Sequence, residues 1–302
     1  MKKMPLRPDA RAFLDWLDRH PGPRMHEVGP EEARRMDRRM HLRWAGPVGA
    51  IAEMRDLDLP IPVRRFDAAP GSGTRPALVF FHGGGFVVGS IDTHAALCAE
   101  LARLTGLPVF AVDYRLAPEH PWPAAPDDCE AAARRIAREP GVDGLVLAGD
   151  SAGGMLAIVT AIALRDDPAA VPVRALWPIY PAIGPGTRYP SFESYGEEHY
   201  LTRADLAWFF AQYAANIRHW RANPLRVTQA GLPPTIILTA QCDPLADQGR
   251  AYAEACRAAG VEIHFREAEG AIHGFASLRA AMPSADIDLR WCAEQLKDML
   301  RT

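Results

Sequence analysis

Gly149-Asp150-Ser151-Ala152-Gly153-Gly154 is the stretch of sequence that decides the fold. The apolar residues 145–148 precede it, and residues 155–164, rich in Ala, Ile and Leu, follow it. This order predicts a buried strand, a sharp turn and a helix. The pattern G-x-S-x-G is typical of a turn that exposes a nucleophilic serine, because glycine on both sides removes side chains that would collide. We predict Ser151 as that nucleophile; an incidental serine in a glycine-rich turn is the alternative.

Outward from this turn, short apolar runs alternate with helical patterns from about residue 77 onward. Further buried strands are expected at residues 77–81 and 109–112, and later strands at residues 175–180, 235–240 and 262–267. Helices are expected at residues 95–104, 247–259 and 286–300. Such alternation indicates an α/β fold, with a mostly parallel central sheet that is flanked by helices.

Two segments depart from this alternation. Residues 1–55 show helical spacing among many arginines, and residues 184–223 interrupt the succession of strands. The second segment carries eight aromatic residues between Tyr189 and Tyr213, out of 25 in the chain. We interpret it as a lid that presents apolar surface to a ligand. The alternative is that the rings only pack a helical subdomain onto the core.

Composition narrows the class of protein. The 302 residues carry a net charge of −3, which favours neither nucleic acid nor an anionic membrane as a partner. Charged residues interrupt the region behind Lys2 and Lys3, so a signal peptide is not expected. No apolar run approaches the length of a membrane-spanning helix, so membrane insertion is not expected either.

The cysteines and histidines do not form a metal motif. The five cysteines are scattered without a C-x-x-C, which favours reduced thiols in a cytoplasmic protein over disulfides or a zinc site. The chain contains no H-E-x-x-H and no tight cluster with ligand spacing, so no metal is expected.

A cluster of glycines directly follows the strand expected at residues 77–81. In His82-Gly83-Gly84-Gly85-Phe86, backbone amides can lie beside the serine turn, where acyl-transfer chemistry needs donors for an oxyanion. We assign that hole to the amides of Gly84, Gly85 and Ala152. A dinucleotide cradle is disfavoured because Val88 stands where G-x-G-x-x-G requires its third glycine. His82 is interpreted as a hydrogen-bonding strap for the loop.

The acid of a catalytic triad is expected after Ser151 and before the histidine. Asp243 follows the strand expected at residues 235–240, at the sheet edge where sites gather in α/β folds. Asp247 is the rival, but it opens the next helix and is better explained as a cap or as a partner of the helix dipole.

The base is expected to be His273. It follows the strand at residues 262–267 after a loop in which Gly270 and Gly274 give room to bend. His264 lies within a strand pattern, and the other two histidines beyond Ser151 fall in the aromatic insertion, at His199 and His219. Oriented by Asp243, His273 would take the proton of Ser151 and return it to the leaving group.

Together these residues predict a serine hydrolase that acts through an acyl-enzyme. The sequence does not separate ester from amide substrates, because both pass through the same kind of intermediate. A non-catalytic small-molecule receptor on the same fold is a further alternative. Such receptors commonly lose the histidine, whereas all three triad positions are filled here.

With these residues placed, about three quarters of the chain resembles the hormone-sensitive-lipase-like (family IV) carboxylesterases of the α/β-hydrolase fold. The motifs are HGGGF at 82–86, DYRLAPEHPWPAAPDD at 113–128, GDSAGG at 149–154, DPL at 243–245 and HGF at 273–275. Met155 and Gln248 depart from the family pattern, outside the triad.

The resemblance implies nucleophile Ser151, acid Asp243, base His273 and an oxyanion hole in the loop Gly83, Gly84 and Gly85 with Ala152. It also implies a helical cap, formed by the segment 1–55 and the insertion at about 184–223, over a hydrolase domain spanning 56–302. Members often hydrolyse short- to medium-chain acyl esters without a cofactor, and often pair as homodimers through a sheet edge.

Overall fold

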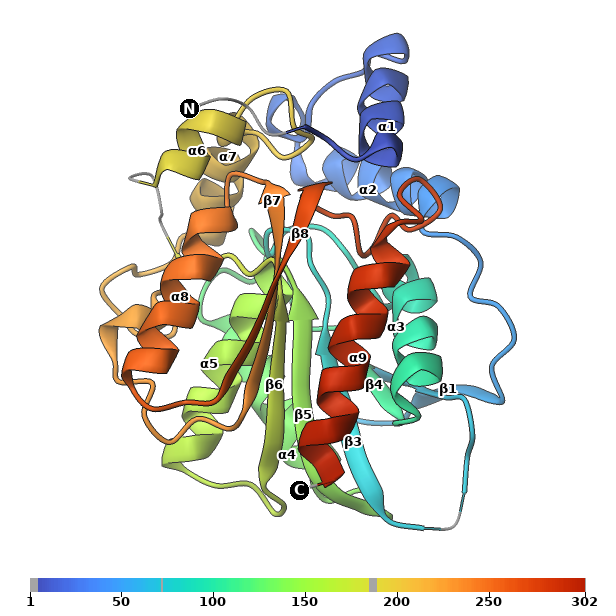
Figure 1. Ribbon diagram of the computed structural model, residues 1–302, viewed down its shortest axis with the longest axis vertical. Helices are drawn as coiled ribbons and strands as arrows, with labels where there is room; N and C mark the ends of the chain where they lie inside the picture. Colours follow the sequence, from blue (N-terminus) through green and yellow to red (C-terminus); the bar gives the residue numbers. More distant parts are fainter. Residues whose placement is uncertain (1–4, 72, 185–188, 302) are drawn as a thin grey trace.

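An eight-stranded sheet forms the centre of the computed structural model, which describes residues 5–71, 73–184 and 189–301 (Figure 1). The strand order is β1-β2-β4-β3-β5-β6-β7-β8. All strands from β3 to β8 run parallel, and β1 and β2 pair antiparallel at one edge. The bounds are β1 Glu53–Leu57, β2 Val63–Asp67, β3 Arg75–Phe81, β4 Val109–Val112, β5 Val142–Asp150, β6 Val173–Ile179, β7 Thr235–Cys242 and β8 Ile263–Ile272.

Helices cover both faces of this sheet, as the sequence predicts. On one face lie α3 (Ile91–Thr105) and α9 (Ala285–Arg301), and on the other lie α4 (Ala124–Ile136), α5 (Ala152–Asp166) and α8 (Ala246–Ala258) (Figure 1). Alternate residues of each central strand point to opposite faces. In β3, Val79 and Phe81 therefore join the core under α5, whereas Leu78 and Phe80 join the core under α3.

The helices α1, α2, α6 and α7 gather beyond the carboxyl ends of the strands (Figure 1). They belong to residues 1–55 and 184–223, the two segments that depart from the alternation of strands and helices. The first segment contributes α1 (Pro8–Arg19), the 3₁₀ helix η1 (Met25–Glu27) and α2 (Pro30–Trp44). The second contributes α6 (Pro190–Tyr195), α7 (Arg203–Tyr213) and η2 (Pro224–Arg226). Residues 1–4 and 185–188 of these segments lie outside the described residues.

The segment expected to be helical up to residue 55 ends instead in a strand. β1 begins at Glu53 and pairs with β2 on the outer edge of the sheet. Its sequence, Glu-Met-Arg-Asp-Leu, has no apolar alternation because the strand is paired on one side only and is mostly exposed. Charged side chains such as Asp56, which forms an ion pair with Arg64, are common on edge strands.

Among the described helices, none combines the length and the apolar character that crossing a bilayer requires.

Candidate active site

Ser151 lies at the sharp turn between β5 and α5. Its backbone has φ 55° and ψ −118°, a conformation that side chains rarely adopt. The flanking glycines are required by packing. A Cβ on Gly149 would lie 2.4 Å from the carbonyl oxygen of Gly153, and one on Gly153 would lie 1.9 Å from that of Phe81. The turn therefore holds Ser151 at the amino end of α5 in a packing that leaves no room for a side chain at residues 149 and 153.

The structure brings Ser151, His273 and Asp243 together in one hydrogen-bonded series. Nε2 of His273 lies 2.9 Å from Oγ of Ser151, and Nδ1 lies 2.6 Å from Oδ2 of Asp243. Asp243 is fully buried after β7, and its other oxygen accepts the Leu245 N–H at 2.8 Å. An ionised carboxylate only accepts hydrogen bonds, so Nδ1 of His273 carries the proton and Nε2 is free to accept from Ser151.

Asp247, the rival acid, lies elsewhere. It stands in the first turn of α8, where its carboxylate accepts the Ser191 N–H at 2.8 Å and forms an ion pair with Arg250. The other histidines also have different surroundings. The ring of His264 contacts Gln295 and Glu262. His199 packs against the ring of Tyr195, and His219 packs against the ring of Trp122.

The glycine loop that follows β3 passes beside the serine turn. Gly84 and Gly85 have φ values of +120° and +59°, and a Cβ on Gly84 would lie 2.2 Å from the Val88 carbonyl oxygen. Within residues 5–71, 73–184 and 189–301, the amides of Gly84 and Gly85 donate no hydrogen bond. Both are therefore available to a ligand at Ser151.

Gly83 differs from the oxyanion donor that the resemblance implies. Its N–H donates to Oδ1 of Asp150 at 2.8 Å, so this amide is engaged within the protein. The direction of one amide depends on backbone angles that the HGGG motif alone does not reveal. Asp150 was given no role from the sequence, although a carboxylate at the end of an apolar strand was an available signal.

His82 supports the glycine loop through a hydrogen bond. Its Nδ1–H donates to the carbonyl oxygen of Gly83 at 2.8 Å, which agrees with the strap predicted from the sequence. The ring stacks on Tyr114 with centroids 4.3 Å apart. Burial, together with the neighbouring His94, lowers the pKa of His82 to about 4. The imidazole is therefore neutral at pH 7.

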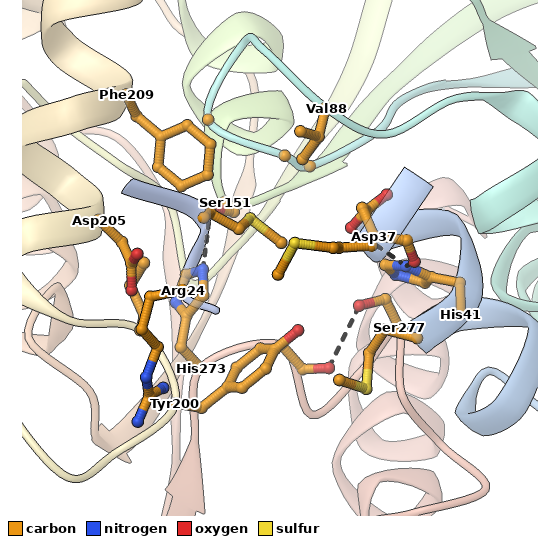
Figure 2. A pocket seen from close by; sticks show the side chains of 18 of the residues that line it. Arg24, Asp37, His41, Val88, Ser151, Tyr200, Asp205, Phe209, His273 and Ser277 are labelled. Carbon is orange, nitrogen blue, oxygen red and sulfur yellow. Dashed lines mark hydrogen bonds and ion pairs between the residues drawn. The ribbon is translucent and has the colours of Figure 1, made fainter. Parts of the chain in front are cut away.

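A cavity of about 900 Å³ opens at Ser151. Figure 2 shows Phe209 of α7 close to Ser151 on one side and the α2 residues Asp37 and His41 at the opposite end. Most of the lining is apolar, and it includes Trp16, Leu17, Met36, Met40, Leu206, Phe209 and Phe210. Cavities of this size and character accommodate small organic ligands.

The five cysteines are free and buried. Among the described residues, no group of three or more His, Cys, Asp or Glu side chains is placed to hold a metal ion.

Comparison with known proteins agrees with this geometry. A family model for the α/β-hydrolase fold matches residues 78–277. Ethyl acetate hydrolase of Pseudomonas putida is 36% identical over 98% of this chain and 100% of its own length. A thermostable esterase of Pseudomonas putida ECU1011 has a TM-score of 0.92 at 28% identity, covering 99% of both chains. An esterase of the archaeon Pyrobaculum calidifontis has a TM-score of 0.92 at 34% identity, over 98% of this chain and 99% of its own. The chain belongs to the hormone-sensitive-lipase-like carboxylesterases of the α/β-hydrolase family.

Proposed function

We propose that this protein is a serine carboxylesterase that hydrolyses short- to medium-chain acyl esters. The observation that carries the proposal is the series Asp243–His273–Ser151, with contacts of 2.6 and 2.9 Å, at the wall of an apolar cavity. Such a series activates a hydroxyl that is otherwise a weak nucleophile at neutral pH.

In the first half of the reaction, Oγ of Ser151 attacks the ester carbonyl carbon while Nε2 of His273 takes its proton. Amides of Gly84, Gly85 and Ala152 stabilise the negative charge that develops on the carbonyl oxygen. The tetrahedral intermediate then breaks its bond to the alcohol oxygen, which leaves with the proton from His273. The product is an acyl-enzyme on Ser151.

In the second half, His273 takes a proton from water, whose oxygen attacks the acyl carbon. Collapse of the second tetrahedral intermediate releases the carboxylic acid and returns the proton to Ser151. Asp243 keeps the imidazole in the correct orientation and stabilises its charged form throughout. Each step balances with ester and water alone, so the proposal includes no cofactor.

The surroundings of the site support the rest of the proposal. We assign the helices of residues 1–55 and the insertion at about 184–223 to a cap over the hydrolase domain, because both segments line the cavity. A short acyl group agrees with the name of the relative from Pseudomonas putida, ethyl acetate hydrolase. The five free thiols fit a cytoplasmic location. A homodimer through the exposed edge strand β8 is also part of the proposal.

The decisive experiment is Ser151→Ala, measured with 4-nitrophenyl butyrate. Loss of the nucleophile is expected to lower kcat by about 10⁴–10⁶-fold. A fluorophosphonate probe should label the native protein and leave the variant unlabelled. Near-normal turnover by a folded Ser151→Ala protein would refute the assignment. Native protein that is neither labelled nor active would instead indicate a receptor, and matched ester and anilide substrates decide between ester and amide hydrolysis.

A further inference from the structure

A series of buried charged and polar side chains lies beneath the glycine loop, outside the triad. It runs from Asp37 and His41 of α2, through His94 of α3, to Asp150 at the end of β5. The rings of His41 and His94 lie 5.1 Å apart. All four side chains are buried, and the mechanism above uses none of them directly. Asp150, the member of the series next to Ser151, contacts the glycine loop.

Asp150 connects the two halves of the site. It directly precedes Ser151, and its Oδ1 accepts the N–H of Gly83 at 2.8 Å. The other carboxylate oxygen, Oδ2 of Asp150, also packs closely against Gly83, because a Cβ on Gly83 would lie 2.6 Å from it. The first amide of the loop is thus held against the residue beside the nucleophile. The Gly83 carbonyl, which accepts from Nδ1 of His82 at 2.8 Å, lies in the same planar peptide unit as the amide of Gly84. Because Gly83 is held at both its N–H and its carbonyl, the direction of the Gly84 amide is restricted.

His94 of α3 contacts this carboxylate. Its Nε2 lies 3.3 Å from Oδ1 of Asp150, within ion-pair distance, and among the described residues this buried nitrogen has no hydrogen-bond partner. The opposite nitrogen, Nδ1, lies 2.9 Å from Oγ1 of Thr93. The Tyr180 hydroxyl, at 3.3 Å from Oδ2, is the remaining partner of Asp150.

A buried carboxylate needs such a partner to remain ionised. Asp150 is 3% exposed. Burial by itself would raise the pKa of Asp150, but attraction to His94, together with the hydrogen bond from the Gly83 N–H, brings this pKa below its ordinary value. The ionised form is the stronger acceptor for the Gly83 amide.

We propose that His94 is a positioning residue which, through Asp150, holds Gly83 and therefore the donors of Gly84 and Gly85 in place over Ser151. This inference rests on the proposed ester hydrolysis at the same site. It assigns α3, which contributes no residue to the proposed triad, a role in positioning the glycine loop. Because the oxyanion forms only during the reaction, loss of this support should lower kcat and leave KM nearly unchanged.

Two substitutions that differ by one methylene group test the proposal. In His94→Gln, the side-chain amide can still donate to Asp150 from about the position of Nε2. In His94→Asn, the same amide is too short to reach. We expect kcat within about threefold of the native value for His94→Gln. For His94→Asn we expect kcat to fall by about 10–100-fold, as is typical for residues that orient a functional group without touching the substrate. KM should stay within about twofold in both.

An inhibitor that forms an oxyanion separates positioning from general damage. A trifluoromethyl ketone adds to the active serine as a charged hemiketal, so its Ki should rise in His94→Asn in parallel with the loss of kcat/KM. His264→Gln is the matched control, because His264 lies on β8 away from the site and forms an ion pair with Glu262. It should change neither quantity. Thermal unfolding confirms that each variant is folded.

Asp150→Asn approaches the same contact from the other partner. It keeps an acceptor of the same shape for Gly83 and removes the charge, so kcat should again fall by about tenfold or more with KM retained. If His94→Asn does not fold, this variant carries the test. Equal kcat in folded His94→Gln and His94→Asn, a loss confined to KM, or native kcat in Asp150→Asn would overturn the proposal. Native enzyme without Ser151-dependent turnover would overturn the proposed function instead.

Discussion

At the scale of single residues, the serine turn depends on glycines, because a side chain at these positions would collide with the backbone. Gly153 lies so close to β3 that a Cβ would stand 1.9 Å from a backbone oxygen, and a backbone oxygen cannot move aside as the end of a flexible side chain can. The nucleophile is therefore supported by close contact between the first turn of α5 and the neighbouring strand. This contact costs conformational freedom but leaves Ser151 a single orientation.

Gly153→Ala should consequently be among the most damaging small substitutions in the chain. We expect the free energy of unfolding to fall by about 3 kcal/mol, as for severe overpacking, together with loss of activity. Urea unfolding measures the first quantity and ester turnover the second. Gly71→Ala is the control, because a Cβ there meets nothing within 4 Å. Its effect should stay within about 0.5 kcal/mol, and equal effects in the two variants would contradict the packing argument.

The neutral His82 predicts a dependence of stability on pH. Its pKa is about 4 in the native protein against 6.5 in the unfolded chain. Below pH 6.5 the unfolded chain takes up a proton at this residue and the native protein does not, so stability falls as pH falls. The loss from this residue should reach about 2 kcal/mol at pH 5.

Urea unfolding at pH 7 and pH 5 measures this loss, with His82→Gln as the comparison. The variant should lose less stability than the native protein between the two pH values, because glutamine does not titrate. Identical losses would show that His82 is not the group responsible.

The three members of the proposed triad could be identified from the sequence because each follows a recognisable strand end, and the structure places them in contact. Ser151 stands in a motif that only a strained turn explains, and Asp243 and His273 follow apolar runs in the expected order. The direction of the Gly83 amide could not be predicted, since it depends on a hydrogen bond to Asp150. The contact of His94 with Asp150 was equally hidden, because it joins residues 94 and 150 by tertiary packing alone.

At the scale of elements, α7 decides how much room a substrate has near the glycine loop. Its Phe209 is 9% exposed, and a Cβ on Gly85 would lie 2.3 Å from the Phe209 ring. Figure 2 shows the same ring close to Ser151. An element of the proposed cap therefore contacts the backbone that carries the proposed oxyanion donors.

Phe209→Leu should shift the enzyme toward longer acyl chains. Removing part of the ring enlarges the cavity beside Ser151, and pocket contacts of this kind change kcat/KM by about tenfold or more per group. A series of 4-nitrophenyl esters from acetate to decanoate measures the preference. Phe192→Leu in α6 is the control, because Phe192 does not line the cavity. An unchanged series in Phe209→Leu would show that α7 does not limit chain length.

The elements themselves were predictable to different degrees. The strands β3 to β7 are mostly buried on both faces, so each appears as an apolar run that the sequence reveals, whereas β8 is partly exposed over residues 263–267. β6 ends at Ile179 rather than at residue 180, because Tyr180 turns to φ 33°. β1 and β2 were missed because their pairing satisfies the backbone without requiring apolar side chains along β1.

At the scale of the whole molecule, the sheet has two edges of different character. β1 ends it with charged, exposed residues, whereas β8 ends it with a ten-residue strand of which residues 263–267 are partly exposed. A long exposed edge favours pairing with a second copy, and a two-fold axis would let two β8 strands pair with each other.

The proposed homodimer gives a direct measurement. Light scattering after size-exclusion chromatography should report about twice the chain mass of 33.1 kDa at micromolar concentration. Dilution should leave this mass unchanged if the edge pairing is stable. A mass of 33.1 kDa across the whole concentration range would contradict the proposal.

The burial of every thiol makes the molecule convenient for optical work. Burial raises the pKa of all five cysteines, so they remain protonated and should react slowly with maleimide dyes. Leu42, 81% exposed at the cavity rim on α2, offers a position for a Leu42→Cys substitution. A fluorophore attached there would be the single rapidly reacting label, and its emission would report on substrate entry without removal of any native cysteine.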